Sequence, residues 1–140
     1  MSKYLFGTRS KTKLDTCDLT LQLVARQALA YGLIDFAIIE GYRNDEKQHQ
    51  YFIEGKSKVD AGDPGAKHNV FSPSKAFDAV PFVNERVSWN QQHCIFLAGV
   101  ILTSAKVVGA ELRWGGNWDM DGEIYTDQHF QDLVHYELVI

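Results

Sequence analysis

Two histidines and one aspartate in this sequence have the types expected of metal ligands. His68 and Asp78 lie ten residues apart, and His135 lies close to the end of the chain. Three ligands of mixed nitrogen and oxygen type leave a fourth tetrahedral position for water, as in catalytic zinc sites, whereas structural sites are usually closed by four Cys or His ligands. Asp132 lies three residues before His135, where a general base would be needed. These residue types suggest a small metallohydrolase.

Each of these residues also has an ordinary explanation. A histidine in a polar loop, such as His68, is most often solvated, and His135 taken alone would be interpreted as a core histidine. Asp78 is more informative, because an acid in an otherwise apolar strand is costly to bury unless it is paired or bound to a metal. On spacing alone, Asp132 would be a surface acid.

Four polar residues could complete a catalytic site. On a turn or helical loop, Asp132 and His135 would lie on the same side, within reach of one water molecule. Glu137 shares a strand face with His135 and could either hold its ring through a hydrogen bond or be the base itself. Arg43 could bind a carboxylate or stabilise an oxyanion, or could be a surface arginine. Gln48 could orient a substrate or brace Arg43.

The remaining histidines and tryptophans are weaker candidates. His129 is an alternative ligand, whereas His49 and His93 lie among polar neighbours on expected helices and receive no role. Trp114 and Trp118 could form the wall of a groove, although packing in the core or at its rim explains aromatic residues equally well.

Composition limits the classes of protein that are possible. With 140 residues, 45% of them hydrophobic, the chain is expected to form one domain over residues 1–140. The formal net charge of -4 and the absence of a Lys/Arg block give no footprint for nucleic acid or an anionic membrane. Cys17 and Cys94 lie far apart in the sequence, so neither a disulfide framework nor a cysteine zinc site is indicated.

The apolar segments do not predict a membrane protein. The amino terminus lacks the apolar region of a signal peptide, so we expect the chain to be made and initially kept in the cytosol. The longest apolar run, Cys94 to Leu102, is about half of the roughly 20 residues that span a bilayer. We therefore expect no membrane insertion, and a monomer.

Helices and strands are expected to alternate irregularly along the chain, which favours an α+β fold: a small single domain with a mainly antiparallel sheet packed against helices. Apolar periodicity and capping residues predict helices over Asp18–Tyr31, Asn44–Glu54 and Gln91–Val108, strands over Phe36–Tyr42, Lys75–Val83, Glu111–Gly115 and His135–Ile140, and long loops over Ser57–Ser74 and Gly116–Gln128. The chain opens with a polar, Lys-rich segment, Thr8–Asp15, to which no helix or strand is assigned. The first long loop carries His68, and loops of this length tend to be functional.

Several short motifs together carry a resemblance to a known family. They are Phe6-Gly7, Gly41-Tyr42-Arg43 followed by Gln48, Lys67-His68, Ala76 to Pro81, Leu112 to Gly116 with Trp118, and Asp132 with His135 to Leu138. In order and spacing, the sequence resembles the small phage endolysin peptidases of the VanY/M15 metallopeptidase family. Those enzymes are similar to D-Ala-D-Ala carboxypeptidases and to L-alanyl-D-glutamate endopeptidases. The resemblance covers nearly the whole chain and implies the D-Ala-D-Ala metallopeptidase (hedgehog/DD-peptidase) fold.

The resemblance also implies a function and roles for five residues. It implies that Zn²⁺ is held by His68, Asp78 and His135, with Asp132 as the general base and Arg43 as the group that stabilises the oxyanion. The expected reaction is hydrolysis of an amide bond of the peptidoglycan stem peptide, with L-alanyl-D-glutamate as the expected bond. An enzyme of this kind would wait in the host cytoplasm until a separate pore former admits it to the cell wall.

Two features depart from the family pattern, and two other functions stay open. The family usually has Ser-x-His at the first ligand, where this chain has Ala66, and it usually places six residues between the His and Asp ligands, where this chain has nine. The extra residues, around Ser72-Pro73-Ser74, are expected to bulge out of the loop. The alternatives are a D,D-carboxypeptidase or dipeptidase on the same scaffold, and a non-catalytic zinc-stabilised protein that binds the cell wall.

Overall fold

The computed structural model describes residues 3–123 and 132–139 of the chain, and it has the expected α+β fold. Its helices are α1 (Thr8–Leu14), α2 (Leu19–Ala30), α3 (Asp45–Ile53) and α4 (Gln91–Val108), and its strands are β1 (Asp35–Glu40), β2 (Ala76–Val83), β3 (Arg86–Val87), β4 (Leu112–Gly115) and β5 (Asp132–Leu138). Residues 57–74 form the expected long loop, with neither a helix nor a regular strand.

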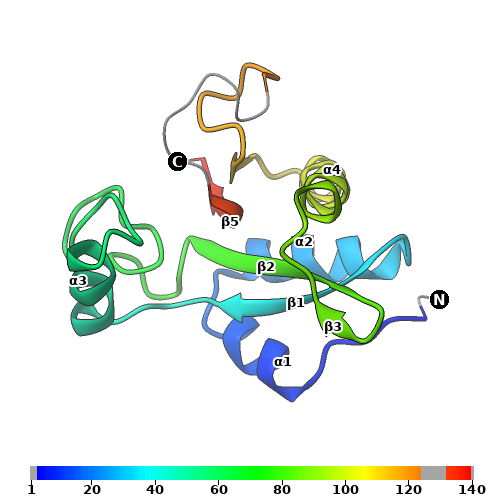
Figure 1. Ribbon diagram of the computed structural model, residues 1–140, viewed down its shortest axis with the longest axis horizontal. Helices are drawn as coiled ribbons and strands as arrows, with labels where there is room; N and C mark the ends of the chain where they lie inside the picture. Colours follow the sequence, from blue (N-terminus) through cyan, green and yellow to red (C-terminus); the bar gives the residue numbers. More distant parts are fainter. Residues whose placement is uncertain (1–2, 124–131, 140) are drawn as a thin grey trace.

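The strands form one antiparallel sheet in the order β1-β2-β5-β4. Strand β5 pairs with the first residues of β2, and β3 pairs with its last two residues, Phe82 and Val83. The last strand of the chain therefore lies between two strands that precede it, as Figure 1 shows for β5 beside β2. This insertion places Asp78 of β2 directly opposite His135 of β5. It also places Arg113 of β4 opposite Glu137 of β5.

The helices cover the sheet and enclose one main core. Helix α4 packs on β2, β4, β5 and α2, whereas α1 packs on β1. Phe77 and Tyr136 from the sheet meet Leu21 of α2 and Leu97 of α4 in this core, and all four side chains are fully buried. Helix α3 and the loop that follows it extend beyond one end of the sheet, at the left of Figure 1. The helices that cover the sheet therefore leave its end beside α3 available for a site.

Local sequence signals explain where the predicted helices begin and end. The Asp18 side chain accepts a hydrogen bond from the Thr20 amide and caps α2, and Asn44 and Asn90 cap α3 and α4 in the same way. Helix α4 ends at Gly109, which has a left-handed φ of 83°. The predicted bounds of this helix are confirmed.

Three elements differ from the prediction. The polar segment Thr8–Asp15, to which no element was assigned, contains α1; this helix buries only Ser10 and Leu14 and therefore has almost no apolar periodicity to detect. The segment between the predicted strand Lys75–Val83 and the predicted helix Gln91–Val108 contains β3, which has only two residues and was not predicted. Strand β5 begins at Asp132 rather than at His135, since pairing with β4 extends it.

Helix α4 is long and apolar enough to cross a membrane by length and composition. Core helices of soluble proteins meet the same criterion, and Leu97, Ile101 and Ala105 of α4 are buried against the rest of the core. Cys94 on this helix is buried as well, and it and Cys17 are both free thiols, as expected from their separation in the sequence.

Gly41 is needed where α1 approaches the end of β1. A Cβ atom at this position would lie 2.2 Å from Thr16 Oγ1 and 2.4 Å from the Lys13 carbonyl oxygen. We expect Gly41→Ala to lower the free energy of unfolding by about 1–3 kcal/mol, because backbone must move to admit the methyl group. Gly99→Ala is the matched control: nothing lies within 4 Å of a Cβ there, so this helical substitution should be neutral or stabilise by up to about 1 kcal/mol. Urea unfolding measures both, and equal effects would contradict the prediction.

Candidate functional site

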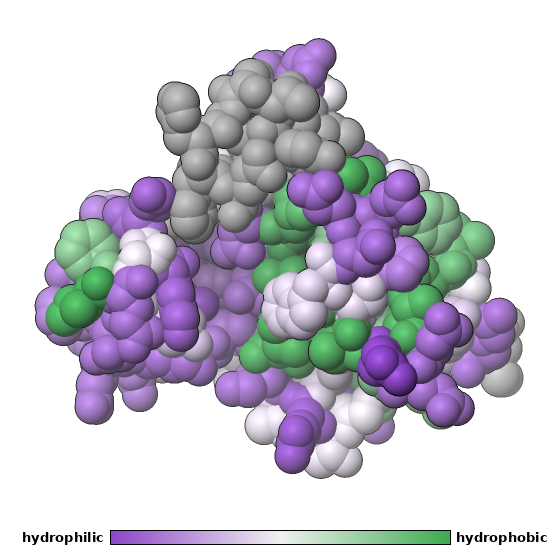
Figure 2. Space-filling model, in the orientation of Figure 1, coloured by the Kyte–Doolittle hydropathy of each residue, from purple (hydrophilic) through white to green (hydrophobic). Residues whose placement is uncertain are grey.

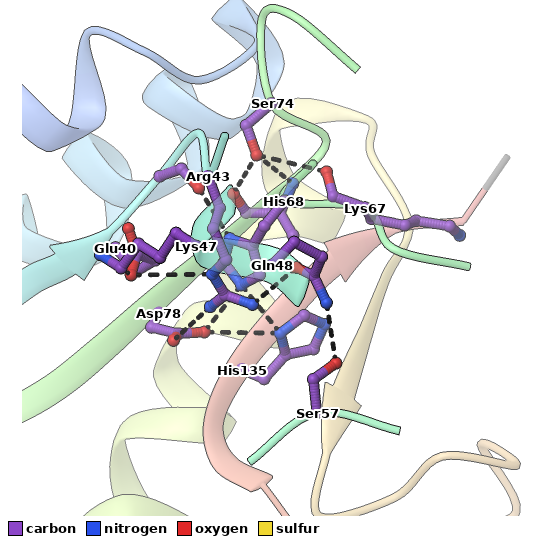
Figure 3. A network of polar contacts seen from close by, with 12 residues as sticks. Glu40, Arg43, Lys47, Gln48, Ser57, Lys67, His68, Ser74, Asp78 and His135 are labelled. Carbon is purple, nitrogen blue, oxygen red and sulfur yellow. Dashed lines mark hydrogen bonds and ion pairs between the residues drawn. The ribbon is translucent and has the colours of Figure 1, made fainter. Parts of the chain in front are cut away.

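Three predicted ligands from distant parts of the chain meet at one point. His68 comes from the long loop, Asp78 from β2 and His135 from β5. His68 Nε2 lies 3.0 Å from Asp78 Oδ1 and 3.1 Å from His135 Nδ1, and the last two atoms are 3.4 Å apart. The nine residues between His68 and Asp78 therefore do not prevent the two side chains from meeting. Figure 3 shows Asp78 and His135 facing each other, with Arg43 beside them.

The outer ring nitrogens of the two histidines are held by oxygen acceptors. His68 Nδ1 lies 2.8 Å from the Gly41 carbonyl oxygen, and His135 Nε2 lies 2.8 Å from Glu137 Oε1. Because a carbonyl and a carboxylate can only accept, each outer nitrogen carries a hydrogen, and in the neutral ring the inner nitrogen then presents a lone pair. When both rings are neutral, two lone pairs and a carboxylate oxygen of Asp78 therefore converge, and positive charge from bound protons or from a metal ion would stabilise them.

The spacing of these three atoms suits a small metal ion. A tetrahedral ion about 2.0–2.2 Å from each ligand would separate the ligand atoms by about 3.3 Å, and the observed separations are 3.0, 3.1 and 3.4 Å. His68, Asp78 and His135 therefore form a possible metal-binding group. Glu137 supports it from behind His135, and Lys67 Nζ, 3.0 Å from Glu137 Oε2, holds this carboxylate in place.

Burial and charge shift the pKa values of several acidic and basic groups here. Burial opposes ionisation of Asp78, but the charges and hydrogen bonds of His68 and His135 outweigh it and hold the pKa of Asp78 below its ordinary value. Burial also opposes protonation of His135, but hydrogen bonds with Asp78 and Glu137 raise its pKa to about 9. Burial and the charge of Asp78 raise the pKa of Asp132, which makes it a stronger base.

An irregular stretch of the sheet brings Asp132 to the same cavity as His135. The sequence argument assumed a turn or helical loop, but Asp132 is the first residue of β5, and in a regular strand residues three apart point to opposite faces. The register shifts here, because Trp114 pairs with Tyr136 and the next residue, Gly115, pairs with Asp132. A Cβ atom on Gly115 would lie 1.9 Å from the Asp132 carbonyl oxygen, so only glycine permits this approach.

Arg43 is buried beside the possible metal-binding group, with only 7% of its surface exposed. One terminal nitrogen donates to Gln48 Oε1 at 2.9 Å, and the other lies 3.9 Å from Asp78 Oδ2. The Gln48 amide nitrogen in turn donates to Ser57 Oγ and to the Val59 carbonyl oxygen. Of the two roles left open for Gln48, these contacts match the brace for Arg43.

Sequence reasoning missed two buried residues that fix Arg43. Glu40 lies 3.8 Å from Arg43 Nε and forms a 2.8 Å ion pair with Lys47. Asn69 donates through its amide nitrogen to the Arg43 carbonyl oxygen at 3.0 Å. Glu40 could have been found by the argument used for Asp78, since it is also an acid in an apolar strand. Asn69, in the long loop, gave no such signal.

These residues line a cavity of about 770 Å³. It contains the possible metal-binding group, Arg43 and Asp132, and the described aromatic residues that line it include Tyr51, Trp89 and Trp118. Helix α3 and the following loop form one wall. Figure 2 shows that lobe, at the left, as mainly hydrophilic, with more hydrophobic surface toward the centre and right of the same view. The cavity is large enough for a short peptide segment.

Of the weaker candidates, Trp118 lies at the cavity, whereas Trp114, His49 and His93 do not. The Trp118 ring lies 5.4 Å from the His135 ring and faces the cavity. Trp114 is instead buried in the core, where its indole nitrogen donates to the Leu133 carbonyl oxygen. His49 and His93 pair with nearby polar groups away from the cavity, at Asp60 and Ser88. His129, the weaker alternative ligand, lies outside the described residues.

Comparisons with known proteins agree on one family. A family model described as phage L-alanyl-D-glutamate peptidase matches residues 1–139. The L-alanyl-D-glutamate peptidase of Escherichia phage T5 is 30% identical over 139 residues, which cover 97% of this chain and 98% of that protein. The crystal structure of the Serratia marcescens L-Ala D-Glu endopeptidase ChiX is similar with a TM-score of 0.76 and 25% identity, and the match covers 98% of this chain and 92% of that one.

Proposed function

Because this chain belongs to the phage L-alanyl-D-glutamate peptidase family, we propose that it is a zinc-dependent enzyme that hydrolyses the L-alanyl-D-glutamate bond of the peptidoglycan stem peptide. The observation that carries the proposal is the convergence of three acceptor atoms, from His68, Asp78 and His135, inside a cavity that Asp132 also lines. The catalytic domain is proposed to span residues 1–140, in keeping with the family match to residues 1–139.

Zinc is the proposed metal because of the ligand types. Two imidazole nitrogens and one carboxylate oxygen are a usual set for tetrahedral zinc, whereas calcium and magnesium prefer oxygen ligands alone. When bound, the ion would supply an activated water molecule and polarise the scissile carbonyl. His68 and His135 would serve as its nitrogen ligands and Asp78 as its oxygen ligand.

Asp132 is the proposed general base, and it would pass the proton on to the leaving amine. Its raised pKa favours both steps. Glu137 is less suited, because His135 occupies one of its oxygens and Lys67 the other. Arg43 is proposed to stabilise the oxyanion, since its contacts with Gln48 and Asp78 hold the guanidinium beside the metal ligands.

The proposed place of action is the bacterial cell wall. A member of this phage family would act there after a separate pore former releases it from the host cytoplasm, as a monomer, without membrane insertion or nucleic-acid binding. Trp118 is proposed to contact the stem peptide, because its ring lies in the cavity beside His135.

The test is the release of free amino groups from purified peptidoglycan by the protein as isolated, after chelation, and after zinc is restored. We expect release that stops with the chelator and returns with zinc, and mass spectrometry of the products should show new glutamate amino termini. Released D-alanine would instead indicate the D,D-carboxypeptidase alternative. Zinc binding with no release from any preparation would contradict the peptidase proposal and support a wall-binding protein.

A further inference from the structure

Arg113 lies on the same face of the sheet as the possible metal-binding group. It pairs with Glu137 across β4 and β5, and Glu137 lies two residues from His135 on β5. Directly paired residues share a face of the sheet, as do residues two apart in a strand. Arg113 accordingly lines the cavity with Glu137 and His135. Its neighbours Leu112 and Trp114 point to the other face and are buried in the core.

Among the described residues, the positive charge of Arg113 has one ion-pair partner, Glu137, and that carboxylate is shared with two closer groups. Glu137 is already neutralised by Lys67 Nζ at 3.0 Å, and it accepts a hydrogen bond from His135 at 2.8 Å. Arg113 Nη1 lies 3.8 Å from Glu137 Oε2, which is beyond hydrogen-bond distance. Arg113 Nε is buried and has no hydrogen-bond partner within residues 3–123 and 132–139. A buried donor of this kind is costly unless a ligand satisfies it.

The proposed substrate offers a matching anion close to the scissile bond. In L-alanyl-D-glutamate, the scissile nitrogen is attached to the glutamate Cα, which also carries the α-carboxyl group. When the peptide continues through the side-chain carboxyl, the α-carboxylate stays free and lies a single carbon away from the scissile nitrogen. An arginine is well suited to such a group, because its two-pronged donor set matches a carboxylate.

We propose that Arg113 binds the free α-carboxylate of the D-glutamyl residue and thereby selects substrates in which this group is not amidated. This proposal rests on the proposed function. The other described arginine of the cavity, Arg43, differs because one of its terminal nitrogens already donates a 2.9 Å hydrogen bond to Gln48 Oε1. The site thus separates two tasks: Arg43 serves the reacting carbonyl and Arg113 the anion on the leaving side.

The experiment compares two synthetic L-alanyl-D-glutamyl peptides that continue through the side-chain carboxyl. One has a free α-carboxylate and the other an α-carboxamide. We expect the wild type to cleave the carboxylate peptide with a kcat/KM about 10- to 100-fold higher, the scale of a charge-assisted hydrogen-bond pair. Arg113→Gln should lose most of that preference by slowing only the carboxylate peptide. Arg113→Lys should keep part of it, because the charge remains.

Lys56→Gln is the matched control for a general effect of charge. Lys56 also lines the cavity, but it is exposed and pairs with Glu54. Its replacement removes one positive charge and should leave the ratio of the two kcat/KM values unchanged. An equal wild-type rate on both peptides would overturn the proposal without any variant. Equal losses on both peptides in Arg113→Gln would overturn it too, and would assign Arg113 only the positioning of Glu137.

A binding measurement separates this proposal from the proposed function. The D-glutamyl product peptide with a free α-carboxylate should bind the zinc-loaded wild type at least about tenfold more tightly than it binds Arg113→Gln in calorimetry. If the wild type cleaves neither peptide but shows this difference, the peptidase function fails and the anion site stands. If it cleaves peptides and the variant binds the product equally well, the anion site fails and the function stands.

Discussion

Replacement of Asp132 by asparagine is expected to lower kcat on the L-alanyl-D-glutamate peptide by about 100- to 10,000-fold, with little change in KM. Asparagine keeps the shape of the side chain but cannot accept the proton of the attacking water, and a positioned acid-base group contributes a factor of this size. Asp132 is not one of the three converging ligands. The variant should therefore bind as much zinc as the wild type, as measured by metal analysis beside the steady-state kinetics.

The control for this prediction is Glu111→Gln. Glu111 is exposed and directly precedes β4, so this variant also removes one carboxylate. It should retain wild-type kinetics. A kcat for Asp132→Asn within a few fold of wild type would move the role of base elsewhere, and Glu137 would be the next residue to test. A large rise in KM with unchanged kcat would instead make Asp132 a substrate-binding group.

Replacement of His68 by alanine is expected to remove the bound metal and to lower activity by at least about 1,000-fold. The ion could then neither activate the water molecule nor polarise the scissile carbonyl. The inner nitrogen of His68 lies within 3.1 Å of both other candidate ligand atoms, so its loss leaves only two ligands. Zinc content after dialysis and amino-group release from peptidoglycan measure the two effects. Excess zinc should restore little activity.

His49→Ala is the matched control for the loss of a histidine. His49 is exposed and pairs with Asp60 outside the cavity. This variant should keep one zinc per chain and full activity. If His68→Ala retained stoichiometric zinc, the proposed ligand set would be wrong. Circular dichroism of both variants checks that the fold is intact, because His68 also holds the Gly41 carbonyl oxygen.

The supporting residues of the site divide into those with a local signal and those without one. The acid in an apolar strand marked Asp78, and the same signal was present at Glu40, where it was not used. Arg113 had no signal, because a lone arginine in a short strand is common. The role proposed for Arg113 depends on the pairing of Glu137 with Lys67. With Arg113, this pairing brings together three segments that lie far apart in the chain.

The amino-acid sequence by itself determined the capped helices α2, α3 and α4, the α+β class, and the residues with metal-ligand chemistry, because capping, periodicity and residue type act over a few neighbours. Only the tertiary structure decided that β5 enters between β2 and β4, which sets His135 opposite Asp78. It also decided that the register shift at Gly115 turns Asp132 toward the same cavity. Strand order and register depend on contacts between segments distant in sequence, and local propensity does not predict these contacts.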